Sequence, residues 1–288
     1  MHDSGSTTYL VTGATGNVGG RVADGLLGRG EHPRVFVRDA AKAAERYGGL
    51  VDVRAGDFAD PASLARAVEG VDVMFLVTAG PDLADRDKSA VDVAKSAGVR
   101  RVVKLSTLDV GSGVGTGVWH REGEAAIRGS GVGFVFVQPS GFMDNFLAWA
   151  ASIKTDGTVR CCAGDGRIPF IHSEDIAAVA VEAMTNPRYG GQSLPITGPE
   201  ALSFADMTAK VGSAIRRQLR FEAIPDEQER RQQAARGVPE ALIEARLEIF
   251  RAIRAGEQAS LTGNVASILG RQPISFARWA EQNAAAFR

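Results

Sequence analysis

The stretch VTGATGNVGG, residues 11–20, constrains the fold of this chain more than any other feature. It places Gly13, Gly16 and Gly19 three residues apart, between an apolar run and a predicted helix at 17–30. Glycines at this spacing let the chain turn tightly off a strand, let a pyrophosphate approach the backbone and let the helix pack on the sheet. The spacing alone is weak, but its place between a strand and a helix is typical of a dinucleotide-binding loop. The residues of this loop predicted to contact a dinucleotide are Gly13, Thr15, Gly16, Asn17 and Val18.

Strand-like and helix-like segments alternate over the first 140 residues. Predicted strands lie at 8–13, 34–39, 51–57, 71–80, 101–107 and 133–140, and predicted helices at 17–30, 40–47, 60–70, 84–98 and about 118–130. Asp60 and Pro61 are typical of the N-cap and first position of a helix. The alternation indicates βαβ units, and it predicts an α/β fold with a Rossmann-type, doubly wound parallel sheet. Right-handed crossovers place the ligand crevice at the carboxyl ends of the strands.

The pattern loosens after residue 141. We expect a helix capped by Ser173, and a last strand at 191–198. Further helices are predicted at 203–217, 226–236, 239–256 and 275–287. The sequence therefore predicts a nucleotide-binding core at 1–150, with segments near 168–198 returning to it. The remainder, 151–288, is predicted to be mainly a smaller, C-terminal substrate-binding region.

The composition excludes several classes of function. A net charge of −1 gives no basic field, so we expect no nucleic-acid partner. No apolar stretch approaches the roughly 18–20 residues that span a membrane, and the N-terminus does not resemble a signal peptide. The two cysteines, Cys161 and Cys162, are adjacent, which favours free thiols over a metal site. We therefore expect a cytoplasmic protein without a membrane partner or a metal.

The end of the second strand predicts the cofactor. Arg38 stands where a Rossmann enzyme contacts the adenosine ribose, and Lys42 follows one turn later. An arginine there accommodates a 2′-phosphate, so we expect NADP(H). A rotated strand end would offer Asp39 to a ribose hydroxyl instead. Further cofactor contacts are expected from residues after the third, fourth and sixth strands, which are Asp57, Phe58, Thr78, Ala79, Gly80 and Pro139.

Together these features resemble the NmrA-like family of atypical short-chain dehydrogenases/reductases. The matching stretches are LVTGATGNVGGRVADGLL, VFVRD, GDFADPASLARAVEGVDVMFLVT, VVKLST, HREGEAAIRGSGVGFVFVQPSGFMDNFL and EDIAAVAVEAM. The resemblance implies a Rossmann core, a preference for NADPH and a small C-terminal substrate region. It also implies one of two activities. Some members reduce quinones or other carbonyl and benzylic substrates, and others bind the nucleotide as redox-sensing regulators.

Short-chain dehydrogenases generally use a serine near the fifth strand and a Tyr-x-x-x-Lys motif on the next helix. This chain has Ser106 and Thr107 at the first place but no Tyr-x-x-x-Lys motif. His120 and Glu124 stand about where that pair would fall. The three candidates for catalysis are Ser106, Thr107 and His120.

Each candidate has a plainer interpretation beside the functional one. Ser106 and Thr107 either bind a substrate oxygen or cap a loop. His120 either donates a proton, since the imidazole pKa lies near neutrality, or packs at the start of a helix. Glu124 either orients that ring or pairs with a surface arginine, and Lys104 could lie near the nicotinamide. Phe142, Met143 and Asn145 are predicted either to contact substrate or to pack in the core.

Without the tyrosine, the sequence favours a substrate whose product oxygen is acidic, because water or a weak donor then suffices to supply the proton. The sequence therefore predicts an NADPH-dependent reductase of a quinone or a polycyclic aromatic ketone, acting as a monomer or homodimer. The alternative is a non-catalytic NADP(H) sensor that binds a regulatory protein. Reduction of C=C, azo or benzylic ether bonds is a third possibility.

Overall fold

The computed structural model describes residues 7–288, so the first six residues of the predicted nucleotide-binding core lie outside the described residues. The chain divides into two compact units. The first unit contains the chain up to Ser106 together with Trp119–Gln138 and Ile176–Leu194, and the second contains Thr107–Val118, Pro139–Asp175 and Pro195–Arg288. The second unit thus includes residues 107–118 and 139–150, which the sequence assigned to the nucleotide-binding core.

The first unit is built on a seven-stranded sheet with the order β3-β2-β1-β4-β5-β6-β9. Its strands are β1 (Tyr9–Thr12), β2 (Arg34–Val37), β3 (Asp52–Ala55), β4 (Val73–Leu76), β5 (Arg101–Leu105), β6 (Gly133–Pro139) and β9 (Ser193–Ile196). All pairings from β3 to β6 are parallel. This order confirms the predicted doubly wound Rossmann-type sheet, whose strand order reverses next to β1.

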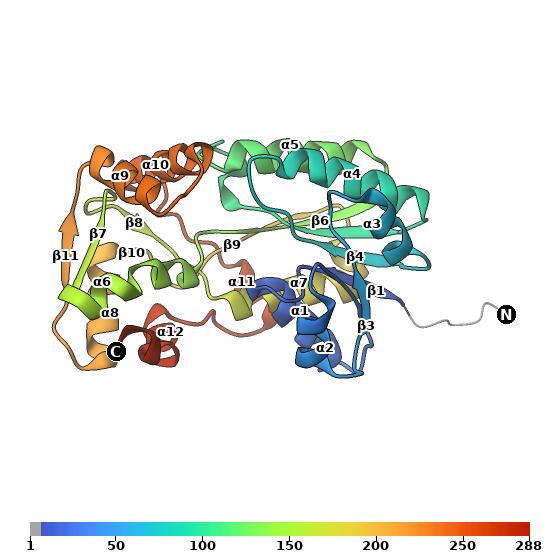
Figure 1. The fold of residues 1–288 in the computed structure, drawn as a ribbon, viewed down its shortest axis with the longest axis horizontal. Coiled ribbons are helices and arrows are strands. Elements are labelled where there is room, and N and C mark those ends of the chain that lie inside the picture. The colour runs from blue at the N-terminus through green and yellow to red at the C-terminus, as the bar shows by residue number, and fades with distance from the viewer. Residues whose placement is uncertain (1–6) are drawn as a thin grey trace. The chain divides into compact units, whose positions relative to one another are not determined.

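Helices cover both faces of this sheet (Figure 1). On one face lie α3 (Pro61–Val68), α4 (Leu83–Ser96) and α5 (Gly117–Gly129), and on the other lie α1 (Asn17–Leu27), α2 (Ala40–Tyr47) and α7 (Ser173–Thr185). The strands β1 and β4 are buried along their whole length, as expected between two helical layers. Asp60 caps α3 by accepting a hydrogen bond from the Ala62 N–H at 3.1 Å, which confirms the predicted cap.

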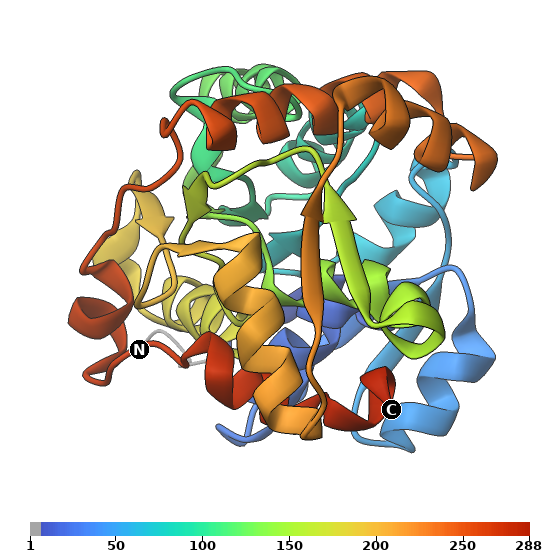
Figure 2. The ribbon, with the colours of Figure 1, turned by 90° about the vertical axis from the view of Figure 1, so that its left-hand side faces the viewer.

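The second unit packs helices around a two-stranded parallel ribbon, which faces the viewer in Figure 2. Its elements are the 3-10 helix η2 (Met143–Trp149), α6 (Ala150–Asp156), β7 (Thr158–Cys161), β8 (Arg167–Ile168), β10 (Leu202–Ser203), α8 (Phe204–Ile215), β11 (Arg220–Ala223), α9 (Asp226–Ala235), α10 (Glu240–Arg254), α11 (Asn264–Leu269) and α12 (Phe276–Gln282). The ribbon consists of β7 and β11, and α8 packs against it. An aromatic cluster around Phe146, Phe204 and Trp279 forms the core.

The start of α7 differs from the prediction. Ser173 is its first residue rather than its cap. The cap is His172, whose Nδ1 accepts the N–H of Glu174 at 3.0 Å. Because Nδ1 accepts, the ring proton is on Nε2, which donates to the side-chain oxygen of Gln282 at 2.9 Å. His172 therefore connects two helices of the fold, and Ser173 donates instead to Asp144.

Candidate functional site

The glycine loop of the first unit has the geometry of a pyrophosphate cradle. Gly13 has a φ of +66°, and a Cβ on Gly19 would lie 2.4 Å from the carbonyl oxygen of Gly13. Only glycine therefore lets α1 approach the end of β1 this closely. No side chain caps α1 at Gly16, so no cap side chain competes with an anion at the first turn of this helix. Tyr47 supports the loop by donating to the carbonyl of Ala14 at 2.7 Å.

The end of β2 presents cations to this site. The carboxylate of Asp39 accepts the backbone N–H of Lys42 at 3.0 Å and thereby caps α2. Arg38 and Lys42 are exposed, and within residues 7–288 neither side chain forms an ion pair. The carboxylate that could bind a ribose is therefore occupied locally, whereas both cations are available to a phosphate.

The other predicted cofactor contacts differ in their accessibility. Asp57 accepts the Ala59 N–H at 2.8 Å, and the half-buried Phe58 ring packs edge-on against Phe36 at 5.7 Å. Ala79 is exposed and Gly80 has a φ of +98°. Pro139 is buried at the end of β6. The predicted contacts that remain open to a ligand are Asp57, Phe58, Ala79 and Gly80.

A buried ion pair lies behind the ends of β4 and β5. Nζ of Lys104 is 2.6 Å from Oδ2 of Asp87, and neither side chain has any exposed surface. Thr78 donates to Oδ1 of Asp87 at 2.7 Å and accepts from Nζ of Lys104 at 3.2 Å. The hydroxyl of Thr78 thus points into the core and not toward a ribose. Burial lowers the pKa of Lys104, and the carboxylate of Asp87 opposes that shift.

This ion pair depends on a glycine in the helix opposite. A Cβ on Gly123 would lie 2.2 Å from Oδ2 of Asp87. A glycine here lets α5 pass directly over the Asp87 carboxylate of α4. Gly123 therefore serves the packing of the first unit.

Glu124 binds the candidate serine. Oγ of Ser106 donates to Oε1 of Glu124 at 2.5 Å, and Nε2 of Gln138 donates to the same oxygen at 2.8 Å. Glu124 is only 4% exposed, and its Oε2 lies 3.9 Å from the guanidinium of Arg128. Glu124 therefore holds Ser106 and contacts Arg128 weakly.

His120 is largely buried, and among the described residues nothing hydrogen-bonds its Nδ1. Burial and the nearby charge of Lys104 lower the pKa of His120 to about 3. The ring is therefore neutral at physiological pH, which removes the near-neutral pKa that favoured it as a proton donor. A neutral imidazole still offers one N–H donor and one acceptor.

The protonation of His120 predicts a pH-dependent stability. The unfolded chain takes up a proton on this ring near pH 6.5, whereas the folded protein resists until about pH 3. Because the unfolded state binds more protons in this window, the free energy of unfolding should fall as the pH drops through it. Urea denaturation at several pH values should show this loss, and His120→Asn should reduce it. The same substitution at the exposed His32 serves as the control, and an equal effect of the two variants would contradict the assignment.

The third catalytic candidate, Thr107, belongs to the second unit. Its Oγ1 accepts the N–H of Asp109 at 3.4 Å and caps a short 3-10 turn. Burial raises the pKa of the Asp109 carboxyl, and the side chains of Thr107 and Gln258 hydrogen-bond to it. Thr107 therefore does cap a loop, beside a carboxyl group that the sequence reasoning missed.

The three predicted substrate residues lie in different environments. Met143 has no exposed surface and packs in the aromatic core of the second unit. Phe142 is half-buried and Asn145 is exposed. Core packing therefore accounts for Met143, while Phe142 and Asn145 retain surface that a ligand can reach.

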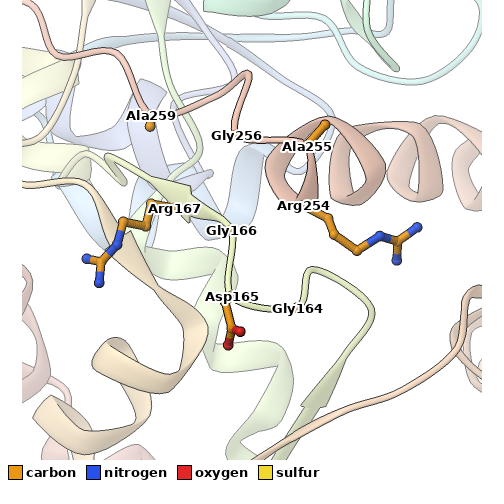
Figure 3. A pocket seen from close by; sticks show the side chains of 8 residues that line it. All are labelled: Gly164, Asp165, Gly166, Arg167, Arg254, Ala255, Gly256 and Ala259. Atoms are coloured by element: carbon orange, nitrogen blue, oxygen red, sulfur yellow. The ribbon is translucent and has the colours of Figure 1, made fainter.

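The second unit also contains a pocket of about 580 Å³, a volume typical of small-molecule sites (Figure 3). It is lined by Gly164, Asp165, Gly166, Arg167, Arg254, Ala255, Gly256 and Ala259. A Cβ on Gly166 would lie 2.0 Å from the carbonyl oxygen of Ile253, so this loop lies directly against the end of α10. Both arginines are held by acids, Arg167 by Asp206 at 2.9 Å and Arg254 by Asp226 at 2.9 Å. Among the residues that line this pocket, the run GDG at 164–166 is the sequence feature that indicates a loop.

The described residues contain neither a metal-binding cluster nor a membrane-spanning helix. No three histidine, cysteine or acidic side chains within residues 7–288 form a group that could hold a metal ion. Over the same part of the chain, no helix combines the length and the apolar character needed to cross a membrane.

Both cysteines are expected to be unreactive in the folded protein. Burial raises the pKa of Cys161 and of Cys162 to about 12. Since the thiolate is the reactive form, a disulfide reagent should label neither thiol quickly under native conditions. Absorbance of the released chromophore should show slow native labelling and rapid labelling of both thiols in denaturant. Rapid labelling of the native protein would contradict the burial of these side chains.

Comparisons with known proteins agree with this geometry. The sequence profile of a family described as NAD(P)H-binding matches residues 13–187. An NAD(P)H azoreductase from Xenophilus azovorans is 37% identical over 96% of this chain and 98% of its own length. A (4-alkanoyl-5-oxo-2,5-dihydrofuran-3-yl)methyl phosphate reductase from Streptomyces griseus is 38% identical over 96% of this chain and 98% of its own.

A solved structure shows the same fold. The crystal structure of an NADPH-dependent quinone oxidoreductase from Escherichia coli, complexed with NADPH, superposes with a TM-score of 0.87. The two proteins are 22% identical, and the match covers 96% of this chain and 99% of that one.

Proposed function

This chain belongs to the NAD(P)H-binding, NmrA-like family of atypical short-chain dehydrogenases/reductases, and from this premise we propose that it is an NADPH-dependent reductase of quinones or polycyclic aromatic ketones. The family assignment and the nicotinamide cofactor agree with the predictions from the sequence. The choice of NADPH rests on the residues after β2. Asp39 caps α2, whereas the side chains of Arg38 and Lys42 form no ion pair within residues 7–288. A free guanidinium matches the geometry of a 2′-phosphate.

The proposed chemistry is a hydride transfer followed by protonation. When bound, the reduced nicotinamide supplies the hydride to the substrate carbonyl, and the chain aligns the two and excludes water. Three polar side chains of the first unit lack the properties of the usual tyrosine. The hydroxyl of Ser106 donates its hydrogen bond to Glu124, Lys104 is fully buried, and the ring of His120 is neutral.

The missing relay favours a particular class of acceptor. Hydride transfer to a quinone gives a hydroquinone anion, which is a weak base and can take its proton from water. An ordinary ketone gives a strongly basic alkoxide, which requires a positioned acid. We therefore propose quinones and polycyclic aromatic ketones conjugated to a phenol, with Thr107 and His120 as polar contacts and Phe142 and Asn145 as substrate contacts.

Azo dyes are a second candidate class. One relative, 37% identical along nearly the whole chain, is named an NAD(P)H azoreductase. Hydride addition to an N=N bond leaves a basic nitrogen anion, so azo reduction requires a proton as well as a hydride. This second candidate therefore rests on the similarity to that relative.

Steady-state assays test this proposal. Loss of reduced-nicotinamide absorbance should be measured with NADPH against quinones, polycyclic aromatic ketones, azo dyes and simple aliphatic ketones. We expect turnover with one or more of the activated classes and little with aliphatic ketones. Tight nucleotide binding without turnover of any acceptor would instead support a redox sensor that acts through a protein partner. A cytoplasmic location and a monomeric or homodimeric state stay predictions.

A further inference from the structure

The hydroxyl of Ser106 has one proton, and the structure shows where that proton goes. A serine hydroxyl donates one hydrogen bond and can accept two. The donor of Ser106 is used by Oε1 of Glu124 at 2.5 Å. Within the described chain, no N–H or O–H donates to Oγ of Ser106, so its lone pairs are unused. Ser106 can therefore offer a ligand an acceptor only.

The carboxylate that takes this proton is itself fixed. Nε2 of Gln138 donates to the same Oε1 at 2.8 Å, so two donors converge on one oxygen. Glu124 is buried, and Lys104 and Arg128 contribute positive charge near it. Glu124 therefore holds the Ser106 hydroxyl in one orientation.

The position of Ser106 indicates the ligand. It directly follows β5, at the carboxyl ends of the parallel strands, where a doubly wound sheet binds its nucleotide. Its own N–H is used by the carbonyl of Val137 in β6 at 2.8 Å. The group that meets Oγ must carry an N–H or O–H. A substrate carbonyl carries neither, whereas the nicotinamide end of the cofactor carries carboxamide N–H and ribose O–H groups.

We infer that Glu124 is a positioning residue, which turns Ser106 into a hydrogen-bond acceptor for the nicotinamide nucleoside instead of a donor to the substrate. This inference rests on the proposed function only in requiring that the chain binds NADPH. In this role Ser106 orients the cofactor. In enzymes with the usual relay, by contrast, the serine binds the substrate oxygen.

Equilibrium binding with two nucleotides tests the inference. Titrations without acceptor should compare NADPH with its 3-acetylpyridine analogue, which lacks the carboxamide N–H. A neutral hydrogen bond contributes about 1 kcal/mol, so Ser106→Ala should weaken NADPH roughly fivefold. If the carboxamide is the donor, the analogue's affinity should change little. If a ribose hydroxyl is the donor, both nucleotides should weaken equally, which also supports an accepting Ser106.

A double-mutant cycle isolates the role of Glu124. Glu124→Gln keeps the shape of the side chain but can present an amide donor to Ser106. This variant should weaken NADPH, whereas the double variant Ser106→Ala/Glu124→Gln should be no weaker than Ser106→Ala alone, since Glu124 acts through Ser106. Glu122→Gln, on the exposed face of the same helix, should change nothing.

Two outcomes separate failure of this inference from failure of the proposed function. The inference is overturned if Ser106→Ala leaves the affinity of both nucleotides unchanged, or if the effects of Ser106→Ala and Glu124→Gln simply add. A wild-type protein that does not bind NADPH would instead contradict the proposed function itself. Thermal unfolding of each variant identifies any loss of affinity that comes from misfolding.

Discussion

Asp87→Ala should lower the free energy of unfolding by about 3–5 kcal/mol, the cost of leaving one member of a buried ion pair without its partner. The Asp87 carboxylate is 2.6 Å from Nζ of Lys104, and both side chains are fully buried. Removing it leaves a buried ammonium group whose one remaining hydrogen bond within residues 7–288 is to the Thr78 hydroxyl, at 3.2 Å. Urea denaturation followed by far-ultraviolet circular dichroism, without nucleotide, measures this loss.

The helix that carries Asp87 provides a matched control. Asp92 pairs with Lys88 at 2.8 Å, but both side chains of this pair are mostly exposed. Solvent screens an exposed pair, so Asp92→Ala should cost much less than Asp87→Ala. The double variant Asp87→Leu/Lys104→Met replaces the buried charges with apolar groups and should recover much of the loss. Equal costs for Asp87→Ala and Asp92→Ala would contradict the burial of the pair.

The sheet of the first unit was predictable because its signals are local. Its strands are short apolar runs bounded by turns, and each helix between them has a cap or an amphipathic face. Asp60 followed by Pro61 predicted the start of α3 correctly. The parallel order then follows from the alternation of strands and helices.

The second unit carried weaker signals. The strands β7 and β11 pair with each other although 58 residues separate Cys161 from Arg220, and each is only four residues long. Pairings of this kind depend on tertiary contacts that no short window of sequence contains. The predicted cap at Ser173 was wrong by one residue, because the imidazole of His172 accepts the N–H of Glu174 and so caps the helix in place of a hydroxyl.

The cofactor loop was predictable from the sequence. The contacts of Lys104 with Asp87 and of Ser106 with Glu124 were only partly predictable. Alternation along β5 predicted that Lys104 and Ser106 share a face, yet their partners come from elements distant in sequence. One feature of the sequence did indicate the partner of Lys104. Asp87 lies on the apolar face of α4, in line with Ala90, Val91 and Ala94, all of them buried. A carboxylate on a buried face requires a cation, and the lysine within an apolar strand was the candidate.

Arg38→Ser should weaken NADPH binding by about 10- to 100-fold and leave NADH binding nearly unchanged. A hydrogen bond to a charged group contributes about 1.5–3 kcal/mol, and only NADPH carries the 2′-phosphate that Arg38 is proposed to bind. The exposed guanidinium has no other partner within residues 7–288, so its replacement should not affect the fold. Equilibrium titration with each nucleotide at low and high salt measures both affinities.

The controls for Arg38 distinguish a specific contact from a general loss of charge. Arg66→Ser removes an exposed positive charge from α3 and should leave both affinities unchanged. Lys42→Ala should weaken NADPH less than Arg38→Ser does, because an ammonium group lacks the two-pronged fit of a guanidinium. Asp39→Asn tests the rival interpretation, in which the carboxylate binds a ribose hydroxyl. If Asp39→Asn weakened NADH strongly while Arg38→Ser left NADPH unchanged, the strand end would be rotated and the chain would prefer NADH. If Arg38→Ser makes the affinities for NADPH and NADH equal, the result supports Arg38 as the contact of the 2′-phosphate. The helix cap then explains why the Asp39 carboxylate does not bind the ribose of NADH.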